Sequence, residues 1–92
     1  MPKEIDFGDF EKVNQLGENQ FSIDTSRGCV FQSYSTIIGF INSKGKIFLD
    51  SHSWDYSKTT SKYRNRWLNM DTSEIKKAIN DGDISLVDLN IR

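Results

Sequence analysis

The sequence has little cysteine, histidine and proline, and these shortages exclude several kinds of site. Cys29 is the only cysteine among the 92 residues, so no disulfide can form within the chain, as is usual in a reducing cytoplasm. A structural zinc site needs four Cys or His ligands, and the chain offers only Cys29 and His52. Pro2 is the single proline, and nothing in the composition marks a linker. We therefore expect one domain over residues 1–92 without a metal or cofactor.

Long apolar runs and phosphate-loop motifs are also missing. No stretch approaches the roughly 20 apolar residues of a membrane-spanning helix. The first residues lack the apolar core of a signal peptide, and no Gly-Lys-Ser/Thr motif occurs. The aromatic fraction of 12 % is too high for a disordered chain. These features predict a folded cytoplasmic protein with no membrane partner.

Charge is distributed unevenly along the chain, although the net charge is only −1. Residues 1–26 contain six acidic residues and two lysines. Residues 57–70 contain no acidic residue and four basic ones, namely Lys58, Lys62, Arg64 and Arg66. Such asymmetry is informative about binding partners.

Hydrophobic patterning predicts strands at 13–16, 21–24, 29–31, 34–41, 46–50 and 84–91. Apolar residues on both faces of 34–41 indicate a central strand covered on two sides. Gly39 within it marks a bulge or the close approach of a large aromatic side chain. Residues 42–45, which end in Gly45, predict a hairpin turn. Residues 1–12 are expected to form either an edge strand or a mobile arm docked by its aromatic residues.

Two helices are predicted between the last two strands. Ser57 or Asp55 can cap the first helix, which runs to about residue 69, with Tyr63 and Trp67 facing the core. Asp71 caps the second helix, with Glu74 at capping-box spacing and Gly82 after its end. The fold class is therefore α+β: a mainly antiparallel sheet of four to five strands, two short helices packed on one face, and a closing C-terminal strand.

Catalytic and metal-binding chemistry has few candidates in this sequence. His52 is the only histidine, and it lies between serines on an expected loop, which favours a solvated side chain over a general base. Asp50 and Asp55 are candidate magnesium or calcium ligands, although such acids more often cap turns and helices. Cys29 follows a glycine on an expected strand and is interpreted as a small buried hydrophobic residue. We expect no enzymatic activity.

The basic residues of the first helix offer a binding surface. Lys58, Lys62 and Arg66 are spaced i, i+4, i+8 and form one outward row, which Arg64 flanks. Phosphates bind such cations, and single-stranded nucleic acid also stacks on aromatic side chains. Exposed Tyr34, Trp54 or Tyr56 would supply the stacking. A solvated helix face and a protein-binding surface are the alternatives.

Four short segments of the sequence form a distinctive set: Phe31-Gln32-Ser33-Tyr34, Trp54-Asp55-Tyr56-Ser57, Thr59-Thr60 and Lys62-Tyr63-Arg64-Asn65. Together they resemble a family of small uncharacterised proteins encoded by phages, prophages and mobile elements. The resemblance covers about residues 29–90 and centres on the spacing W-D-Y-S-x-T-T-x-K-Y. It implies a mobile-element setting in a bacterial host cell, and it assigns no catalytic residue.

Two functions remain open from the sequence. The first is a non-enzymatic accessory protein that binds DNA or RNA through Lys58, Lys62, Arg64 and Arg66. The second is an anti-defence protein, an inhibitor that binds a host enzyme or defence complex through the acidic residues 1–26. An exposed sheet edge would also allow two copies of the chain to pair as a homodimer.

Overall fold

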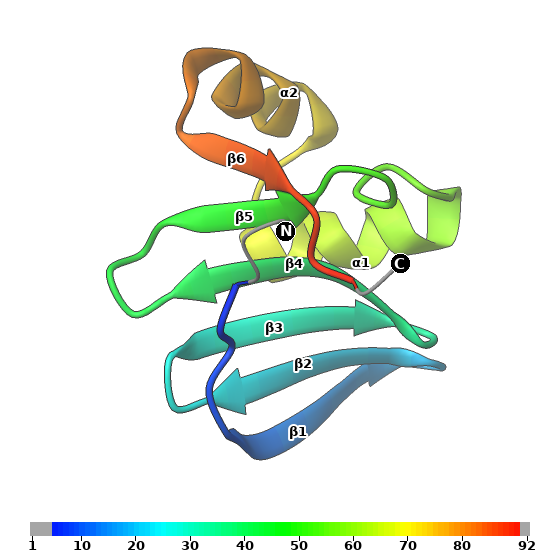
Figure 1. The fold of residues 1–92 in the computed structure, drawn as a ribbon. Helices are drawn as coiled ribbons and strands as arrows, with labels where there is room; N and C mark the ends of the chain where they lie inside the picture. The colour runs from blue at the N-terminus through cyan, green and yellow to red at the C-terminus, as the bar shows by residue number, and fades with distance from the viewer. Residues whose placement is uncertain (1–4, 91–92) are drawn as a thin grey trace.

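A six-stranded sheet and two helices make up the computed structural model, which describes residues 5–90 (Figure 1). The order of strands in the sheet is the order in the chain. The pairs from β1 to β5 are antiparallel, and β6 joins the edge parallel to β5. The elements are β1 (Phe10–Gly17), β2 (Gln20–Thr25), β3 (Gly28–Ser33), β4 (Thr36–Asn42), β5 (Ile47–Asp50), α1 (Lys58–Leu68), α2 (Thr72–Asp81) and β6 (Ile84–Val87).

This architecture confirms the predicted α+β class and the closing C-terminal strand. The sheet has six strands rather than four or five, because the short stretches predicted at 13–16 and 29–31 each extend into a full strand. The strand predicted at 34–41 begins instead at Thr36, since Tyr34 takes a left-handed φ of 55° in the tight turn between β3 and β4. The predicted closing strand ends at Val87, and Ile91 lies outside the described residues.

The predicted turns and helix ends are confirmed by their hydrogen bonds. In the β4–β5 hairpin, Asn42 Oδ1 accepts from the backbone N–H groups of Lys44 and Lys46, and Gly45 has a φ of 86°. Ser57 caps α1 by accepting from the backbone N–H of Thr60. α2 begins with a complete capping box between its N-cap residue and Glu74, and it ends at a left-handed glycine. Neither helix among residues 5–90 is long and apolar enough to cross a membrane.

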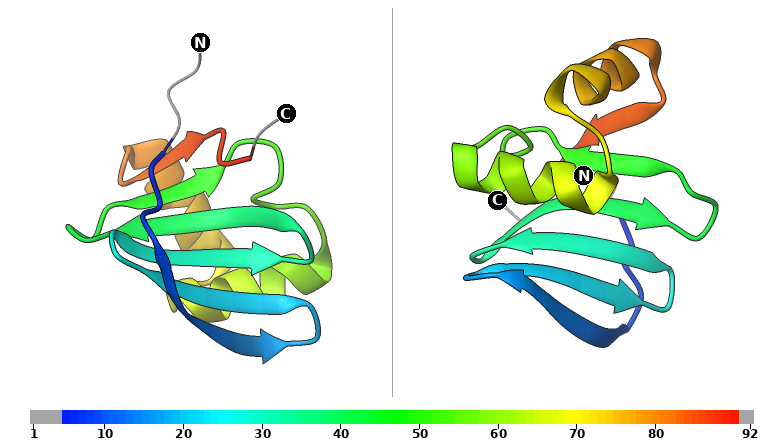
Figure 2. Two further views of the ribbon diagram at one scale, coloured as in Figure 1. Left: turned by 60° about the horizontal axis from the view of Figure 1, so that its bottom comes forward. Right: turned by 180° about the vertical axis from the view of Figure 1, so that it is seen from behind.

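The two faces of the sheet are covered differently. Both helices lie on the face turned away from the viewer in Figure 1, as the reverse view shows (Figure 2). On that face Trp67 of α1 stacks on Phe31, with ring centroids 5.6 Å apart, and Ile75 of α2 packs with Leu49 and Ile84. The Trp67 ring also lies against Gly39 of β4. The pairing of β3 with β4 shifts register beside Gly39. The predicted bulge and the predicted close approach of an aromatic side chain are therefore both confirmed.

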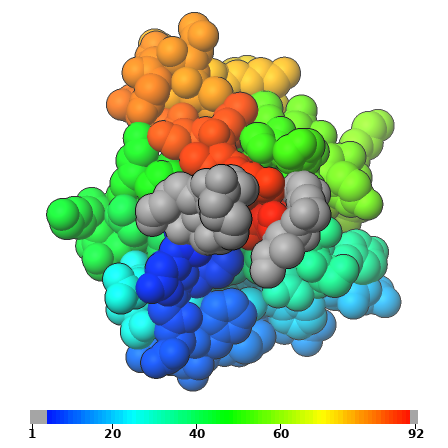
Figure 3. All heavy atoms as spheres, viewed as in Figure 1, coloured from blue at the N-terminus to red at the C-terminus, as the bar shows by residue number. Residues whose placement is uncertain are grey.

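The chain segments before β1 and after β6 cover the opposite face (Figures 1 and 3). Phe7 packs on Phe40 with ring centroids 5.1 Å apart, and Leu89 joins the same apolar cluster. Within the predicted arm 1–12, residues 5–9 are therefore a docked segment without regular secondary structure, and the strand starts at Phe10; residues 1–4 lie outside the described residues. β4 is covered on both sides, as its apolar pattern predicted.

Candidate functional site

Three of the predicted basic residues form an exposed row on α1. Lys58, Lys62 and Arg66 are all exposed. A helix rises 1.5 Å per residue, so the row spans about 12 Å along the axis. Lys62 Nζ and the Arg66 guanidinium carbon each lie 5.5 Å from the centre of the Tyr63 ring. Among residues 5–90 no carboxylate forms an ion pair with any of the three cations, so their charge is available to a ligand.

α1 is held on the sheet by polar and aromatic contacts rather than by an aliphatic stripe. Near its start, the Thr60 hydroxyl lies 3.0 Å from the hydroxyl of Ser33 in β3. In its middle the Tyr63 ring covers Gly17 at the end of β1. Near its end Trp67 Nε1 donates to Cys29 Sγ at 3.4 Å, and Cys29 is half-buried rather than buried as predicted. These contacts fix the orientation of the exposed row.

Arg64 does not lie on the exposed face of α1, so its predicted place in a nucleic-acid-binding row is wrong. Its side chain is 0 % exposed. The guanidinium donates to the backbone oxygen of Trp54 at 2.6 Å, to Asp55 Oδ1 at 3.2 Å, to Asn65 Oδ1 at 2.9 and 3.1 Å, and to Thr72 Oγ1 at 3.3 Å. Arg64 therefore links the loop before α1, α1 itself and the start of α2. A phosphate cannot reach it.

Asp55 supplies the carboxylate of this buried network. Partial burial raises the pKa of Asp55, but the hydrogen bond from Ser61 and the adjacent Arg64 guanidinium outweigh that effect and hold the pKa below its ordinary value. The carboxylate is thus ionised at neutral pH. Asp50, the other predicted cation ligand, instead lies near His52 and Asp88, whereas Asp55 pairs with Arg64.

Two exposed tyrosines lie at the N-terminal end of the row. Tyr34 is 58 % exposed and Tyr56 is 67 % exposed. Tyr56 directly precedes the N-cap residue Ser57, and Tyr34 directly follows Ser33, which contacts the first turn of α1. Trp54 is half-buried: the Arg64 guanidinium lies 5.2 Å from its ring centre and the ring packs against the cluster of Leu49, Ile75 and Ile84, so it offers less aromatic surface than the two tyrosines. Aromatic surface and positive charge are therefore adjacent here.

A second group of polar residues gathers where β5 and β6 end. Potential ligand atoms of Asp50, His52 and Asp88 lie within 4.8 Å of one another. Asp50 is buried and accepts a hydrogen bond from the backbone N–H of Leu89 at 2.9 Å, so it has a structural task in holding the C-terminal segment. His52 is exposed, and its Nδ1 lies 3.3 Å from the hydroxyl of its neighbour Ser51. Sequence spacing did not indicate Asp88, because the parallel pairing of β5 with β6 brings it here.

Comparison with known families places this geometry in context. The model of a family of unknown function (DUF8033) matches residues 10–82. The chain belongs to this family. The match spans β1 to the end of α2 and so includes the whole basic row of α1. No curated protein and no solved structure matches the chain. Membership of an uncharacterised family agrees with the expectation from the sequence, and it assigns no activity to the row.

Proposed function

We propose that this DUF8033 protein is a non-enzymatic accessory protein of a phage or mobile element that binds nucleic acid in the cytoplasm of a bacterial host. The observation that carries the proposal is the exposed row of Lys58, Lys62 and Arg66 without an acidic partner among residues 5–90. The mobile-element setting rests on the resemblance of the sequence around the W-D-Y-S-x-T-T-x-K-Y spacing.

Nucleic acid suits this surface better than a protein partner does. Cations on one helix face bind phosphates and release condensed counterions, which gives affinity without sequence reading. Lys62 and Arg66 both lie close to the Tyr63 ring, and this contact restricts their conformations before a ligand arrives. The overall charge of −1 does not oppose binding, because screening limits distant acidic residues to a range of about 8–10 Å at physiological salt.

The decisive experiment measures fluorescence anisotropy of labelled DNA and RNA oligonucleotides at several salt concentrations. The triple variant Lys58→Gln, Lys62→Gln, Arg66→Gln should lose most of the binding. If all three cations contact phosphates of a single strand, the slope of log K against log salt should fall by about 2, or roughly 0.7 for each contact. The matched control replaces three exposed lysines elsewhere, Lys12, Lys76 and Lys77, by glutamine. Equal binding by the two triple variants, or no binding by the wild type at low salt, would refute the proposal.

A second function, inhibition of a host enzyme or defence complex by protein binding, is favoured by β1. This edge strand exposes Phe10 at 53 % and Val13 at 59 %, next to the acidic Glu11. Edge strands with exposed apolar residues can pair with a partner strand. Affinity capture from host lysate tests this function by comparing the wild type with Val13→Lys. A partner retained by the wild type and lost by this variant would support inhibition over nucleic-acid binding.

A further inference from the structure

Two exposed tyrosines beside the basic row narrow the kind of nucleic acid that this surface fits. Tyr56 is 67 % exposed and lies two residues before Lys58, the first cation of the row. Tyr34 is 58 % exposed and follows Ser33, whose hydroxyl lies 3.0 Å from that of Thr60 in the first turn of α1. The turn between β3 and β4 and the start of α1 lie at the same end of the sheet in both directions of view (Figures 1 and 2). Positive charge and exposed aromatic surface therefore meet at this end of α1.

The backbone of Tyr34 takes a conformation that disfavours a residue of this type. Its φ of 55° lies in the left-handed region, which suits Gly, Asn and Asp better than an aromatic residue. The turn between β1 and β2 has Asn19 in the same region, with a φ of 61°. Main-chain groups hold the Tyr34 turn, because its N–H donates to the backbone oxygen of Asn19 at 2.6 Å and its own oxygen accepts from Gln32 Nε2 at 2.7 Å. A strained backbone that carries an exposed ring, and no core contact, indicates a role at the surface.

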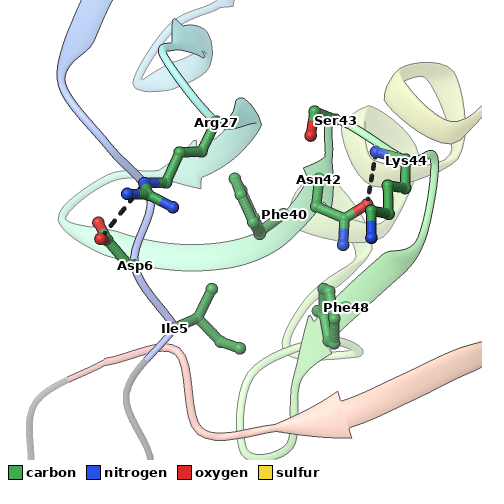
Figure 4. Close-up of a pocket in the computed structure, with 8 residues that line it drawn as sticks. All are labelled: Ile5, Asp6, Arg27, Phe40, Asn42, Ser43, Lys44 and Phe48. Atoms are coloured by element: carbon green, nitrogen blue, oxygen red, sulfur yellow. Dashed lines mark hydrogen bonds and ion pairs between the residues drawn. The ribbon is translucent and has the colours of Figure 1, made fainter.

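The aromatic rings on the opposite face of the sheet show the contrast. There a hollow lies between the N-terminal segment and the β4–β5 hairpin (Figure 4). Phe40 in its wall is 2 % exposed beneath Phe7, and Phe48 stacks on Phe40 with ring centroids 6.3 Å apart. These rings cover one another and offer no face to a base. Tyr34 and Tyr56, in contrast, stack on no aromatic ring or cation within residues 5–90.

We propose that the α1 row and the two tyrosines bind single-stranded rather than duplex nucleic acid, an inference that rests on the proposed function. In a duplex the bases are paired and stacked on each other, so an exposed tyrosine finds no base face. In a single strand the bases are available, and they stack on aromatic side chains while cations bind the phosphates. Tyr56 and Tyr34 stack bases at the N-terminal end of the row. A single strand is flexible enough to pass from the row around the start of α1 to Tyr34, whereas a duplex is stiff over about 50 nm.

Fluorescence anisotropy with four labelled probes tests the inference. They are a single-stranded DNA of about 12 nucleotides, an RNA of the same sequence, the corresponding DNA duplex, and a strand of abasic nucleotides. At one salt concentration the wild type should bind the DNA or the RNA strand at least about tenfold more tightly than the duplex. The abasic strand keeps the phosphates without the bases, so it should bind no more tightly than the duplex. The tighter of the two base-containing strands distinguishes DNA from RNA as the ligand, and either supports the inference.

Matched variants separate stacking from charge. Tyr34→Asn and Tyr56→Ala should each weaken binding of the base-containing strand about fivefold or more and leave binding of the duplex and the abasic strand unchanged. Phe10→Ala removes another exposed ring, at the start of the edge strand β1, and should change no affinity. Tyr34→Asn should unfold at the same urea concentration as the wild type or a higher one, because Asn adopts left-handed backbone at less cost. Its weaker binding would then not result from unfolding.

The outcomes distinguish this inference from the proposed function. Equal affinity for the single strand and the duplex, or undiminished single-strand binding by both tyrosine variants, would overturn the inference and leave the proposed function in place. No binding of any probe by the wild type would refute the proposed function itself. The triple glutamine variant of the α1 row should lose binding to all four probes, whereas the tyrosine variants should lose only the part that depends on bases.

Discussion

Replacing Arg64 should destabilise the protein more than replacing any exposed cation of α1. The substitution Arg64→Ala removes a guanidinium that is 0 % exposed. It deprives four acceptor groups of a donor: the backbone oxygen of Trp54 and the side chains of Asp55, Asn65 and Thr72. It also removes the contact with the Trp54 ring at 5.2 Å. Each of these losses acts in the folded state only.

The expected cost follows from the burial of the network. Breaking a buried charge network by deleting one partner typically costs about 3–5 kcal/mol. Asp55 is 45 % exposed and regains water when Arg64 is removed, so the lower part of that range applies, about 3 kcal/mol. A chain of this length has a total unfolding free energy of about 5–14 kcal/mol. Arg64→Ala should therefore remove a fifth to more than half of the stability.

Urea denaturation monitored by tryptophan fluorescence and circular dichroism measures this effect. Arg64→Lys keeps the charge but cannot reproduce the planar set of donors, so it should recover only part of the loss. Arg66→Ala is the matched control on the same helix, and it should cost about 0.5 kcal/mol or less because Arg66 is exposed. If Arg64→Ala lowered the free energy of unfolding by no more than Arg66→Ala does, the structural role assigned to Arg64 would be wrong.

Three further substitutions test other parts of the structure. Gln20 is fully buried, and within residues 5–90 neither polar atom of its side chain has a hydrogen-bond partner. Gln20→Met should therefore raise the free energy of unfolding, measured by urea denaturation, by about 1–2 kcal/mol. A Cβ at Gly39 would lie 2.7 Å from the Trp67 ring, so Gly39→Ala should cost about 1–3 kcal/mol and change the tryptophan emission spectrum. The pKa of Asp55 is lowered from 3.8 in the folded state, so its contribution to stability is complete above about pH 4 and is lost as pH falls through the lowered pKa. Acid unfolding of Asp55→Asn should therefore show a shallower loss of stability below pH 4 than the wild type, and an identical pH profile would contradict this assignment.

Local signals in the sequence predicted the helix ends and the β4–β5 hairpin correctly. Ser57, Asp71 with Glu74, and Gly82 act through hydrogen bonds to backbone groups a few residues away, so a short window of sequence contains both partners. Gly45 likewise sets its turn locally. The sequence-based prediction placed the break between β3 and β4 too early in the chain, at residues 32–33 instead of 34–35, because Tyr34 is not a residue type that marks left-handed backbone.

The candidate surface was predicted only in part, because tertiary contacts decide which basic residues of α1 are exposed. Lys58, Lys62 and Arg66 were correctly expected on the exposed side of α1. Arg64 lies two residues from Lys62 and Arg66 and is a basic residue like them. The segments that bury it lie before α1, at Trp54, and after α1, at Thr72. No periodicity encodes that arrangement.

The order of strands in the sheet has a consequence for how the chain folds. From β1 to β5 every neighbour in space is also the next strand in sequence, so each hairpin closes across a short loop and can form in about 1–10 μs. β6 is different, because it must return past both helices to pair with β5. Closing that long loop carries the larger entropic cost. The antiparallel strands β1 to β5 should therefore pair early, and docking of β6 after the helices should complete the native state.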